Sequence, residues 1–244
     1  MHTLPQNKDK GKVVVLSERL SAIAESLPDH AVVCDVGSDH GDLPLSLLQM
    51  KKSPRVIVTD LNPLPLSRAK KNIENAGYLE LAQFVLTDGI EEVIPFDPDV
   101  FVIAGMGGET IAGILDRALS RLCVGMRFVL QPMTKVSVLR EFLYENGFLI
   151  QNERIIYENH KFFPVLWVEY DAVKRLEKQK FSCVGEHVIL DRSEETKLYF
   201  EKLLKQINQK ICGKKKANAD ISQEEIEKNQ LELLVKEFYE DSRN

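Results

Sequence analysis

Three aspartates lie in and beside a glycine-bearing turn near the start of the chain. Residues 32–44 read VVCDVGSDHGDLP, an apolar strand that runs into a turn. A dinucleotide-binding turn at this place reads G-x-G-x-x-G and lets backbone N–H groups approach a pyrophosphate, but Asp39 stands where the middle glycine would be. A carboxylate so close to a phosphate would cost on the order of several kcal/mol at a partly buried site. The turn therefore argues against NAD and ATP and favours a cationic, phosphate-free nucleoside.

S-Adenosylmethionine is such a nucleoside, because it has a sulfonium and an α-ammonium group. We expect Asp60 to accept hydrogen bonds from its ribose hydroxyls, Asp88 to bind its adenine amino group, and residues 104–108 (AGMGG) to leave room for its methyl group. The predicted cofactor-binding residues are Asp35, Gly37, Ser38, Asp39, Asp60, Leu61, Asp88, Gly89, Ala104, Gly105, Met106 and Gly107. Taken singly, Asp60 also suits a helix entry and Asp88 an ordinary turn. Together these strand-end residues favour a methyltransferase.

The elements that would position these turns alternate along the first 171 residues. We predict strands at 31–36, 55–60, 83–86, 99–104 and 126–131, and helices at 16–27, 42–50, 63–76, 109–120 and 136–146. Two further β segments, 148–157 and 162–170, have no helix between them and predict an antiparallel hairpin at the sheet edge. This alternation predicts an α/β fold, a Rossmann-like class I methyltransferase sheet with helices on both faces.

The pattern changes after residue 171. Apolar residues share one helical face around 203–211 and again around 231–238, with a polar break at 213–220 between them. We therefore predict a methyltransferase domain over 1–171 and a coiled-coil-like helical hairpin within 172–244.

Charge is unevenly distributed along the chain. The net charge is −6 over residues 1–171, +6 over 172–216 and −5 over 217–244. The basic block fits a nucleic-acid contact, but a solvated helix face has the same composition.

We expect a cytoplasmic protein without a membrane span and, although no sequence feature sets the oligomeric state, a monomer. No apolar run approaches the 18 residues that a span needs, and the polar start contains no signal-peptide core. Cys34, Cys123, Cys183 and Cys212 have no metal-ligand or redox spacing, so no metal site is expected. The apolar neighbours of Cys34 and Cys123 predict free, buried thiols.

Four short segments resemble the bacterial tRNA (adenine-22-N1)-methyltransferase family, the TrmK type. They are LSERL (16–20), DVGSDH (35–40), AGMGG (104–108) and LQP (130–132), and the resemblance covers nearly the whole chain. It implies that methyl is transferred from S-adenosylmethionine to N1 of an adenine in the D-arm of tRNA, the expected partner. One departure is Gly41-Asp42, where family members have Ala-Tyr, and it bears on how the target base is held.

Transfer to N1 needs little catalytic apparatus, because N1 has an available lone pair. Alignment and compensation of the positive charge that reaches the ring are the main requirements. Asp39 is the candidate for that compensation, or it only holds the α-ammonium group; His40 relays a proton or only stabilises the turn. No Asn-Pro-Pro-Tyr motif for exocyclic amino groups is present at 104–107, which favours a ring nitrogen.

The predicted tRNA-binding residues are Arg19, Lys214, Lys215 and Lys216. Alternatively, the hairpin only covers the methyltransferase domain. Two other functions also remain open: a methyltransferase for another RNA, a small molecule or a protein, and a non-catalytic RNA-binding protein with a vestigial cofactor fold.

Overall fold

The computed structural model describes residues 13–191 and 193–240. Its contacts divide the chain into two compact units. The first unit holds the described residues up to Ala104 together with Ile114–Leu122, and the second holds Gly105–Gly113 and the residues from Cys123 onward. The predicted boundary at residue 171, between a methyltransferase domain and a C-terminal helical hairpin, stays a prediction.

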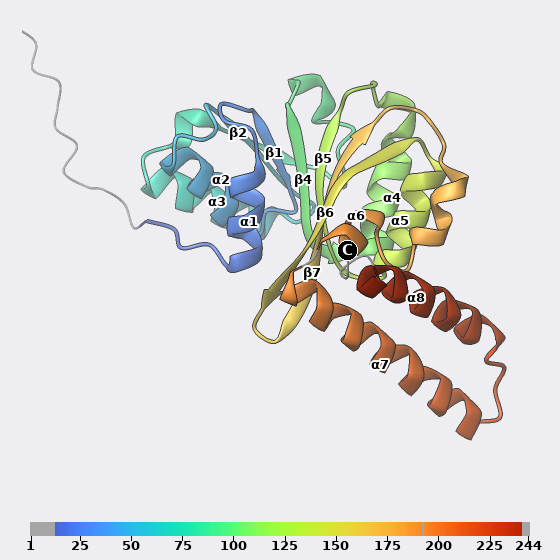
Figure 1. Cartoon of the computed structure of the whole chain (residues 1–244). Coiled ribbons are helices and arrows are strands. Elements are labelled where there is room, and N and C mark those ends of the chain that lie inside the picture. The colour runs from blue at the N-terminus through green and yellow to red at the C-terminus, as the bar shows by residue number, and fades with distance from the viewer. Residues whose placement is uncertain (1–12, 192, 241–244) are drawn as a thin grey trace, which may run out of the picture. The chain divides into compact units, whose positions relative to one another are not determined.

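The first unit is built on parallel strands covered by short helices (Figure 1). Its strands are β1 (Val33–Val36), β2 (Val56–Asp60), β3 (Ala82–Leu86) and the start of β4 (Val100–Gly107). Its helices are α1 (Glu18–Ser26), α2 (Asp42–Gln49) and α3 (Pro63–Asn75), with 3₁₀ turns at Leu79–Leu81, Ile94–Phe96 and Leu119–Arg121. Every residue of β1 and β2 is buried, as expected for parallel strands with near-continuous apolar sequence.

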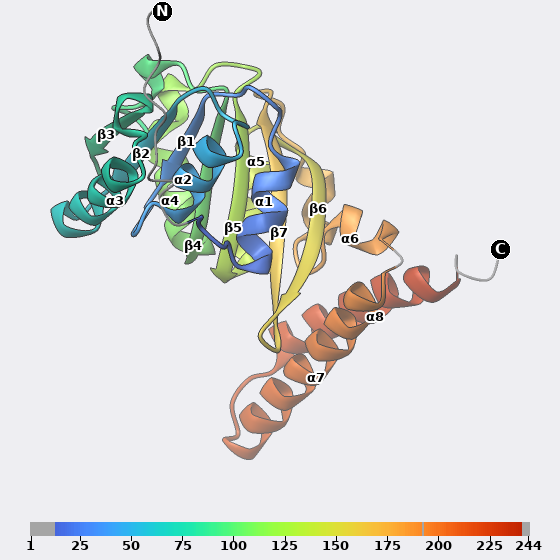
Figure 2. The same cartoon turned by 90° about the vertical axis from the view of Figure 1, so that its left-hand side faces the viewer.

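The second unit contains antiparallel strands and the C-terminal helices. Its strands are β5 (Arg127–Thr134), β6 (Phe148–Glu158) and β7 (Lys161–Tyr170), with β7 paired to both of the others. Its helices are α5 (Val136–Glu145), α6 (Glu186–Leu190), α7 (Glu194–Lys216) and α8 (Ser222–Glu240), with a 3₁₀ segment at Leu176–Phe181. The helix α4 (Gly108–Ala118) belongs partly to each unit. The views in Figures 1 and 2 agree that α7 and α8 lie side by side as a hairpin.

The seven strands follow the order β3-β2-β1-β4-β5-β7-β6. The first five positions match a Rossmann-like sheet, and β6 comes last in the order. The predicted fold class and the predicted edge hairpin are therefore confirmed.

A buried ion pair joins several elements of the second unit. Arg140 on α5 and Glu153 on β6 both have side chains without solvent exposure, and Arg140 Nε donates to Glu153 Oε2 at 3.1 Å. Arg140 Nη1 donates to the carbonyl oxygens of Ser182 at 2.7 Å and Cys183 at 3.2 Å. Although burial opposes it, the Glu153 carboxylate raises the pKa of Arg140, so the guanidinium stays charged. A Cβ at Gly185 would lie 1.9 Å from Glu153 Oε2, so only glycine fits there.

Several details differ from the sequence predictions, among them the end of β5, which lies at Thr134 instead of residue 131. Helix α7 continues through Gly213 to Lys216 instead of breaking there, because cationic side chains in a last turn stabilise a helix and offset the cost of a mid-helix glycine. Strand β4 runs on to Gly107, beyond the predicted end at 104. Cys34 is buried as predicted, but Cys123 is exposed, since it lies in a surface connection before β5.

None of the helices in the described ranges is apolar and long enough to cross a bilayer.

Candidate active site

The turn between β1 and α2 is fixed to the end of β2 by backbone hydrogen bonds. The N–H groups of Gly37 and Ser38 both donate to the carbonyl oxygen of Thr59, at 3.0 and 2.9 Å. Gly37 has φ of 75°, Asp39 has φ of 48° and Gly41 has φ of 73°, so the backbone enters the left-handed region three times within this turn. The turn thus brings Gly37, Ser38 and Asp39 to the carboxyl end of the first strands, as predicted.

Gly41 lets the start of α2 approach α3 closely. A Cβ at this position would lie 2.9 Å from the Cβ of Ala69 on α3, and φ is 73°. The next residue, Asp42, is the exposed first residue of α2, where a carboxylate interacts favourably with the helix dipole. The Gly41-Asp42 departure from the resembled family therefore has a local structural reason here.

The Asp60 carboxylate joins two turns of the first unit. It lies at the end of β2 and is 9% exposed. Oδ1 accepts from the Asn62 N–H at 2.8 Å, and Oδ2 accepts from the Asp39 N–H at 3.4 Å. Because each carboxylate oxygen has two lone pairs, both can still accept from a ligand. Leu61, the next residue, is 59% exposed and offers an apolar surface beside this carboxylate.

Asp35 is a buried carboxylate near the carboxyl end of β1, the strand next to β2. It is 7% exposed, and its main-chain carbonyl oxygen accepts from the Ser38 hydroxyl at 2.9 Å. Burial, together with the nearby carboxylates of Asp60 and Asp42, raises the pKa of Asp35 to about 6. A cationic ligand at this edge would favour the ionised form and offset that burial.

Asp39 and His40 form an exposed pair. His40 Nε2 lies 3.4 Å from Asp39 Oδ2, and the two side chains are 51% and 65% exposed. The main-chain carbonyl of His40 accepts from Asn72 Nδ2 at 3.0 Å, which fixes the turn to α3. Both predicted catalytic side chains are therefore close together and open to solvent.

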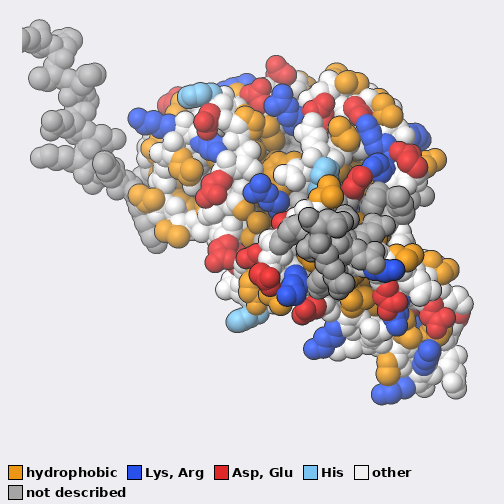
Figure 3. All heavy atoms as spheres, in the orientation of Figure 1, with side chains coloured by type: hydrophobic (Ala, Val, Ile, Leu, Met, Phe, Trp, Pro, Cys, Tyr) orange, Lys and Arg blue, Asp and Glu red, His pale blue; other side chains and the backbone are white. Residues whose placement is uncertain are grey.

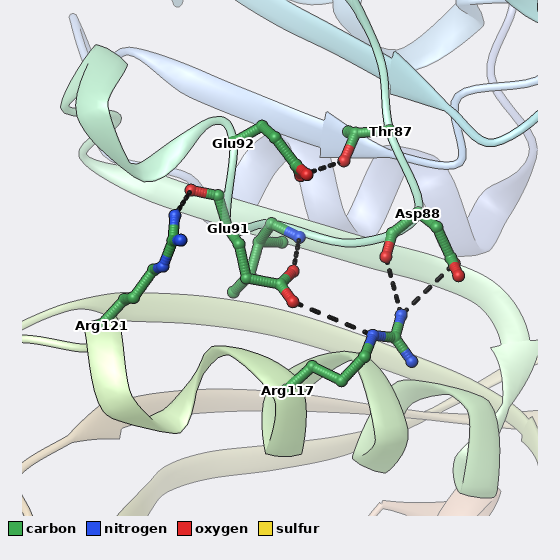
Figure 4. A network of polar contacts seen from close by, with 7 residues as sticks. Thr87, Asp88, Glu91, Glu92, Arg117 and Arg121 are labelled. Atoms are coloured by element: carbon green, nitrogen blue, oxygen red, sulfur yellow. Dashed lines mark hydrogen bonds and ion pairs between the residues drawn. The ribbon is translucent and has the colours of Figure 1, made fainter.

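The turn after β3 is held by two arginines of the first unit (Figure 4). Arg117 Nη2 donates to the main-chain oxygen of Asp88 at 2.7 Å and lies 3.3 Å from its Oδ1. Arg121 Nη1 donates to the Glu91 carbonyl at 3.2 Å, and the Thr87 hydroxyl donates to the Glu92 carboxylate, which lowers the pKa of Glu92. Arg117 thus positions Asp88. The sequence does not reveal this pairing, because Arg117 lies on α4, 29 residues further along the chain.

The glycine cluster at the end of β4 is tightly packed within the second unit. Gly105, with φ of 80°, donates its N–H to Oε1 of the buried Gln131 at 3.2 Å. A Cβ at Gly108 would lie 2.3 Å from the Lys135 carbonyl oxygen, so the backbone there permits no side chain. The motif LQP (130–132) contains this positioning glutamine, although the sequence alone gave it no role. Ala104 and Met106 flank Gly105 and are both partly exposed.

The predicted tRNA-binding cations lie in different environments. Arg19 is a partly buried residue of α1. Lys214 Nζ donates to Glu224 at 2.8 Å, and Lys215 Nζ lies 3.7 Å from Glu225, whereas Lys216 forms no ion pair with a residue that the structure describes. Figure 3 shows this mixture of basic and acidic side chains over the α7–α8 hairpin.

The carboxylates of the first unit fit a cationic nucleoside. Asp35, Asp39 and Asp60 stand at the carboxyl ends of adjacent strands, and Asp88 follows the third. This arrangement can bind positive charge and hydroxyl donors, and it would repel phosphate. Within residues 13–191 and 193–240, His, Cys, Asp and Glu side chains form no group of three that could hold a metal ion.

Known proteins resemble this chain in sequence and in structure. A tRNA (adenine(22)-N(1))-methyltransferase from Bacillus subtilis is 34% identical over 154 residues, which span 63% of this chain and 65% of that protein. The crystal structure of the B. subtilis M1A22 tRNA methyltransferase TrmK superposes with a TM-score of 0.78 at 27% identity, covering 93% of this chain and 98% of that one.

A Streptococcus pneumoniae protein, a putative tRNA (m1A22) methyltransferase solved in complex with S-adenosyl-L-methionine, superposes with a TM-score of 0.78 at 28% identity. The match covers 90% of this chain and 99% of that chain. The family model described as a methyltransferase domain matches residues 16–166, which include every strand-end turn described above, and the chain belongs to that family.

Proposed function

We propose that this protein transfers the methyl group of S-adenosylmethionine to N1 of adenine 22 in the D-arm of tRNA. The observation that supports this most is the carboxylate-lined turn after β1, in a chain that matches the B. subtilis tRNA methyltransferase structure over 93% of its length. Asp35 and Asp60 would bind a cationic nucleoside, and the Asp39 carboxylate beside them would disfavour phosphate-bearing cofactors.

The chain's own residues would act by alignment and electrostatics. Bound S-adenosylmethionine supplies an activated methyl group. Gly105 at the end of β4 has no side chain to occupy the space that a flat base needs, and its hydrogen bond to Gln131 holds the backbone in place there. Asp39, exposed beside His40, would stabilise the positive charge that reaches the adenine ring.

The C-terminal hairpin would contact tRNA phosphates. Its basic α7 favours this role. In the last turn of α7, which we call the tip and which holds Lys214, Lys215 and Lys216, Lys216 is the exposed lysine that is not paired with a described acid. Lys214 and Lys215 would have to leave Glu224 and Glu225 to bind a phosphate directly. Arg19 on α1 is a further proposed contact.

A methyl-transfer assay separates the proposed function from its alternatives. We expect purified protein to move the labelled methyl group of S-adenosylmethionine into unmodified tRNA and to produce N1-methyladenine in nuclease digests. Label in protein or small molecules instead of tRNA would favour another methyltransferase, and cofactor binding without any transfer would favour a non-catalytic RNA-binding protein.

Substitution of Asp60 should weaken cofactor binding. We expect Asp60→Ala to reduce the affinity for S-adenosylmethionine by about 1.5–3 kcal/mol, the usual worth of hydrogen bonds to a charged group. Asp60→Asn, which keeps one acceptor oxygen, should lose less. Calorimetric titration measures both, and a wild-type affinity in Asp60→Ala would remove this carboxylate from the cofactor site.

Cofactor binding should depend on pH through Asp35. Because the pKa of Asp35 is about 6 in the folded protein, this carboxyl is neutral below that pH and ionised above it. A cationic ligand favours the ionised form, so affinity should be full above about pH 7 and fall as pH drops through 6, by up to roughly tenfold per pH unit. Calorimetry between pH 5 and 8 measures this, and the Asp35→Asn variant should lack that slope; an equal slope in both would assign it to another group.

A further inference from the structure

An aromatic cluster stands at the turn between β6 and β7, at one end of α7. It consists of Tyr157, His160 and Phe162 from the β6–β7 hairpin, with Tyr199 and Lys202 from α7, and we call it the hairpin corner. Both views in Figures 1 and 2 place this β-turn beside α7. The predicted cofactor site does not include any of these residues.

The rings of the hairpin corner form a continuous series of tilted and edge-on contacts that is exposed at one end. Tyr157 and Phe162 are cross-strand partners with ring centroids 4.8 Å apart, and Phe162 lies 5.8 Å from the buried Tyr199. Tyr157 is 39% exposed, and its hydroxyl lies 3.3 Å from Nδ1 of the exposed His160. The turn keeps His160 at φ of 60°, in a region more usual for glycine. Tyr199 is thus buried and Phe162 half-buried, whereas Tyr157 and His160 face solvent.

Two lysines add positive charge to this aromatic cluster. Lys202 Nζ lies 5.1 Å from the Phe162 ring centroid, within the range of a cation–π contact. Lys161 is exposed at the start of β7, and neither lysine forms an ion pair with a described residue. The nearest acid in the ladder is Glu158, opposite Lys161, and it is only 9% exposed. Exposed aromatic rings beside unpaired cations are the combination that binds single-stranded nucleic acid.

The lysines at the far end of α7 differ in this respect. Lys210 and Lys214 both lie against Glu224, at 3.0 and 2.8 Å, and Lys215 lies near Glu225. The Lys214 and Lys210 hydrogen bonds lower the pKa of Glu224 to about 2, so this acid stays ionised at neutral pH. Most of the positive charge at the tip is therefore already neutralised within the hairpin.

We propose that the hairpin corner is a tRNA-docking surface, on which an unstacked loop base packs against Tyr157 and His160 while Lys161 and Lys202 contact the flanking phosphates. The inference rests on the proposed function, because it takes tRNA as the partner. Base stacking on aromatic rings is the usual way in which proteins hold splayed-out RNA bases. The ion-paired tip of α7 would then contribute mainly to the stability of the α7–α8 hairpin.

Binding of an unmodified tRNA transcript, measured by fluorescence anisotropy across a range of KCl concentrations, tests this surface. We expect Tyr157→Leu to weaken tRNA binding by about five- to 150-fold and Tyr157→Phe to bind nearly as wild type, since stacking on one base has that worth and the hydroxyl adds little. Lys161→Gln with Lys202→Gln should reduce the slope of log K against log [KCl] by about 1.5. The matched control, Lys214→Gln with Lys215→Gln, should leave that slope nearly unchanged.

Melting temperature and S-adenosylmethionine affinity serve as controls for folding, and both should stay at wild-type values in Tyr157→Phe and in the Lys161→Gln/Lys202→Gln variant. The Lys214→Gln/Lys215→Gln variant should keep its S-adenosylmethionine affinity but melt at a lower temperature, because it loses the ion pairs with Glu224 and Glu225. If the tip variant loses the salt slope and the corner variants keep it, the corner is not the docking surface, although methylation by the wild type would still support the proposed function. If the wild-type protein neither binds nor methylates tRNA, both proposals fail.

Discussion

Replacing Asp39 with asparagine should lower turnover at saturating S-adenosylmethionine by about a hundred- to a thousand-fold, or roughly 2.7–4 kcal/mol of transition-state stabilisation. The substitution keeps size and polarity, and asparagine tolerates the left-handed backbone that Asp39 adopts at φ of 48°. It removes only the carboxylate, which matters most when positive charge reaches the adenine ring. Cofactor affinity should therefore change little, and single-turnover methylation with a direct binding measurement separates the two effects.

His40→Gln is the matched control, because it breaks the 3.4 Å contact between His40 and Asp39 while keeping the carboxylate. If charge stabilisation is the role of Asp39, this variant should retain most of the turnover. A weakened cofactor affinity with intact saturated turnover in Asp39→Asn would instead assign this carboxylate to the α-ammonium group.

Replacing Arg140 with methionine should destabilise the second unit by about 3–5 kcal/mol, because Glu153 would remain as an uncompensated buried charge. The carbonyl oxygens of Ser182 and Cys183 would also lose their donor. The protein has a single tryptophan, Trp167 on β7, so tryptophan fluorescence during urea unfolding reports on this unit directly.

A double variant separates the stability that comes from the Arg140–Glu153 ion pair from the cost of leaving one of its charges buried alone. Arg140→Met with Glu153→Leu replaces both charges by apolar groups, and such replacements are often nearly neutral. We expect the double variant to be more stable than Arg140→Met alone. Additive losses from the two substitutions would show that the ion pair itself is not what connects α5 to β6.

Much of the fold could be predicted because local patterns and tertiary structure agree. The buried strands β1 and β2 are short apolar runs, and α3 begins at Pro63 and is followed by Gly77, as its sequence signals indicate. The end of α7 could not be predicted, because Gly213 and three lysines read as a break in isolation. Ion pairs with α8, whose position only the fold defines, keep that segment helical.

In the candidate site, too, local sequence patterns predict some features, and others depend on segments that only the fold brings together. Asp35, Asp39 and Asp60 could be predicted because strand ends in a parallel sheet meet at one edge. The hydrogen bonds of Asp60 to two turns, and of Gln131 to Gly105, depend on segments brought together by folding. Likewise, Arg117 is 29 residues from Asp88, and Arg140 is 42 from Ser182, separations at which no sequence pattern identifies a partner.

The position and the atom of methylation test the central claim most directly. An unmodified tRNA transcript is incubated with the protein and S-adenosylmethionine, and reverse transcription then maps blocks along the D-arm, since methylation at N1 removes the base-pairing edge of adenine. We expect a single block at adenine 22, the position in the name of the B. subtilis relative, and we expect this block to disappear when that adenine is replaced by guanine. A transcript that is methylated without any block, or blocked only at another position, would contradict it.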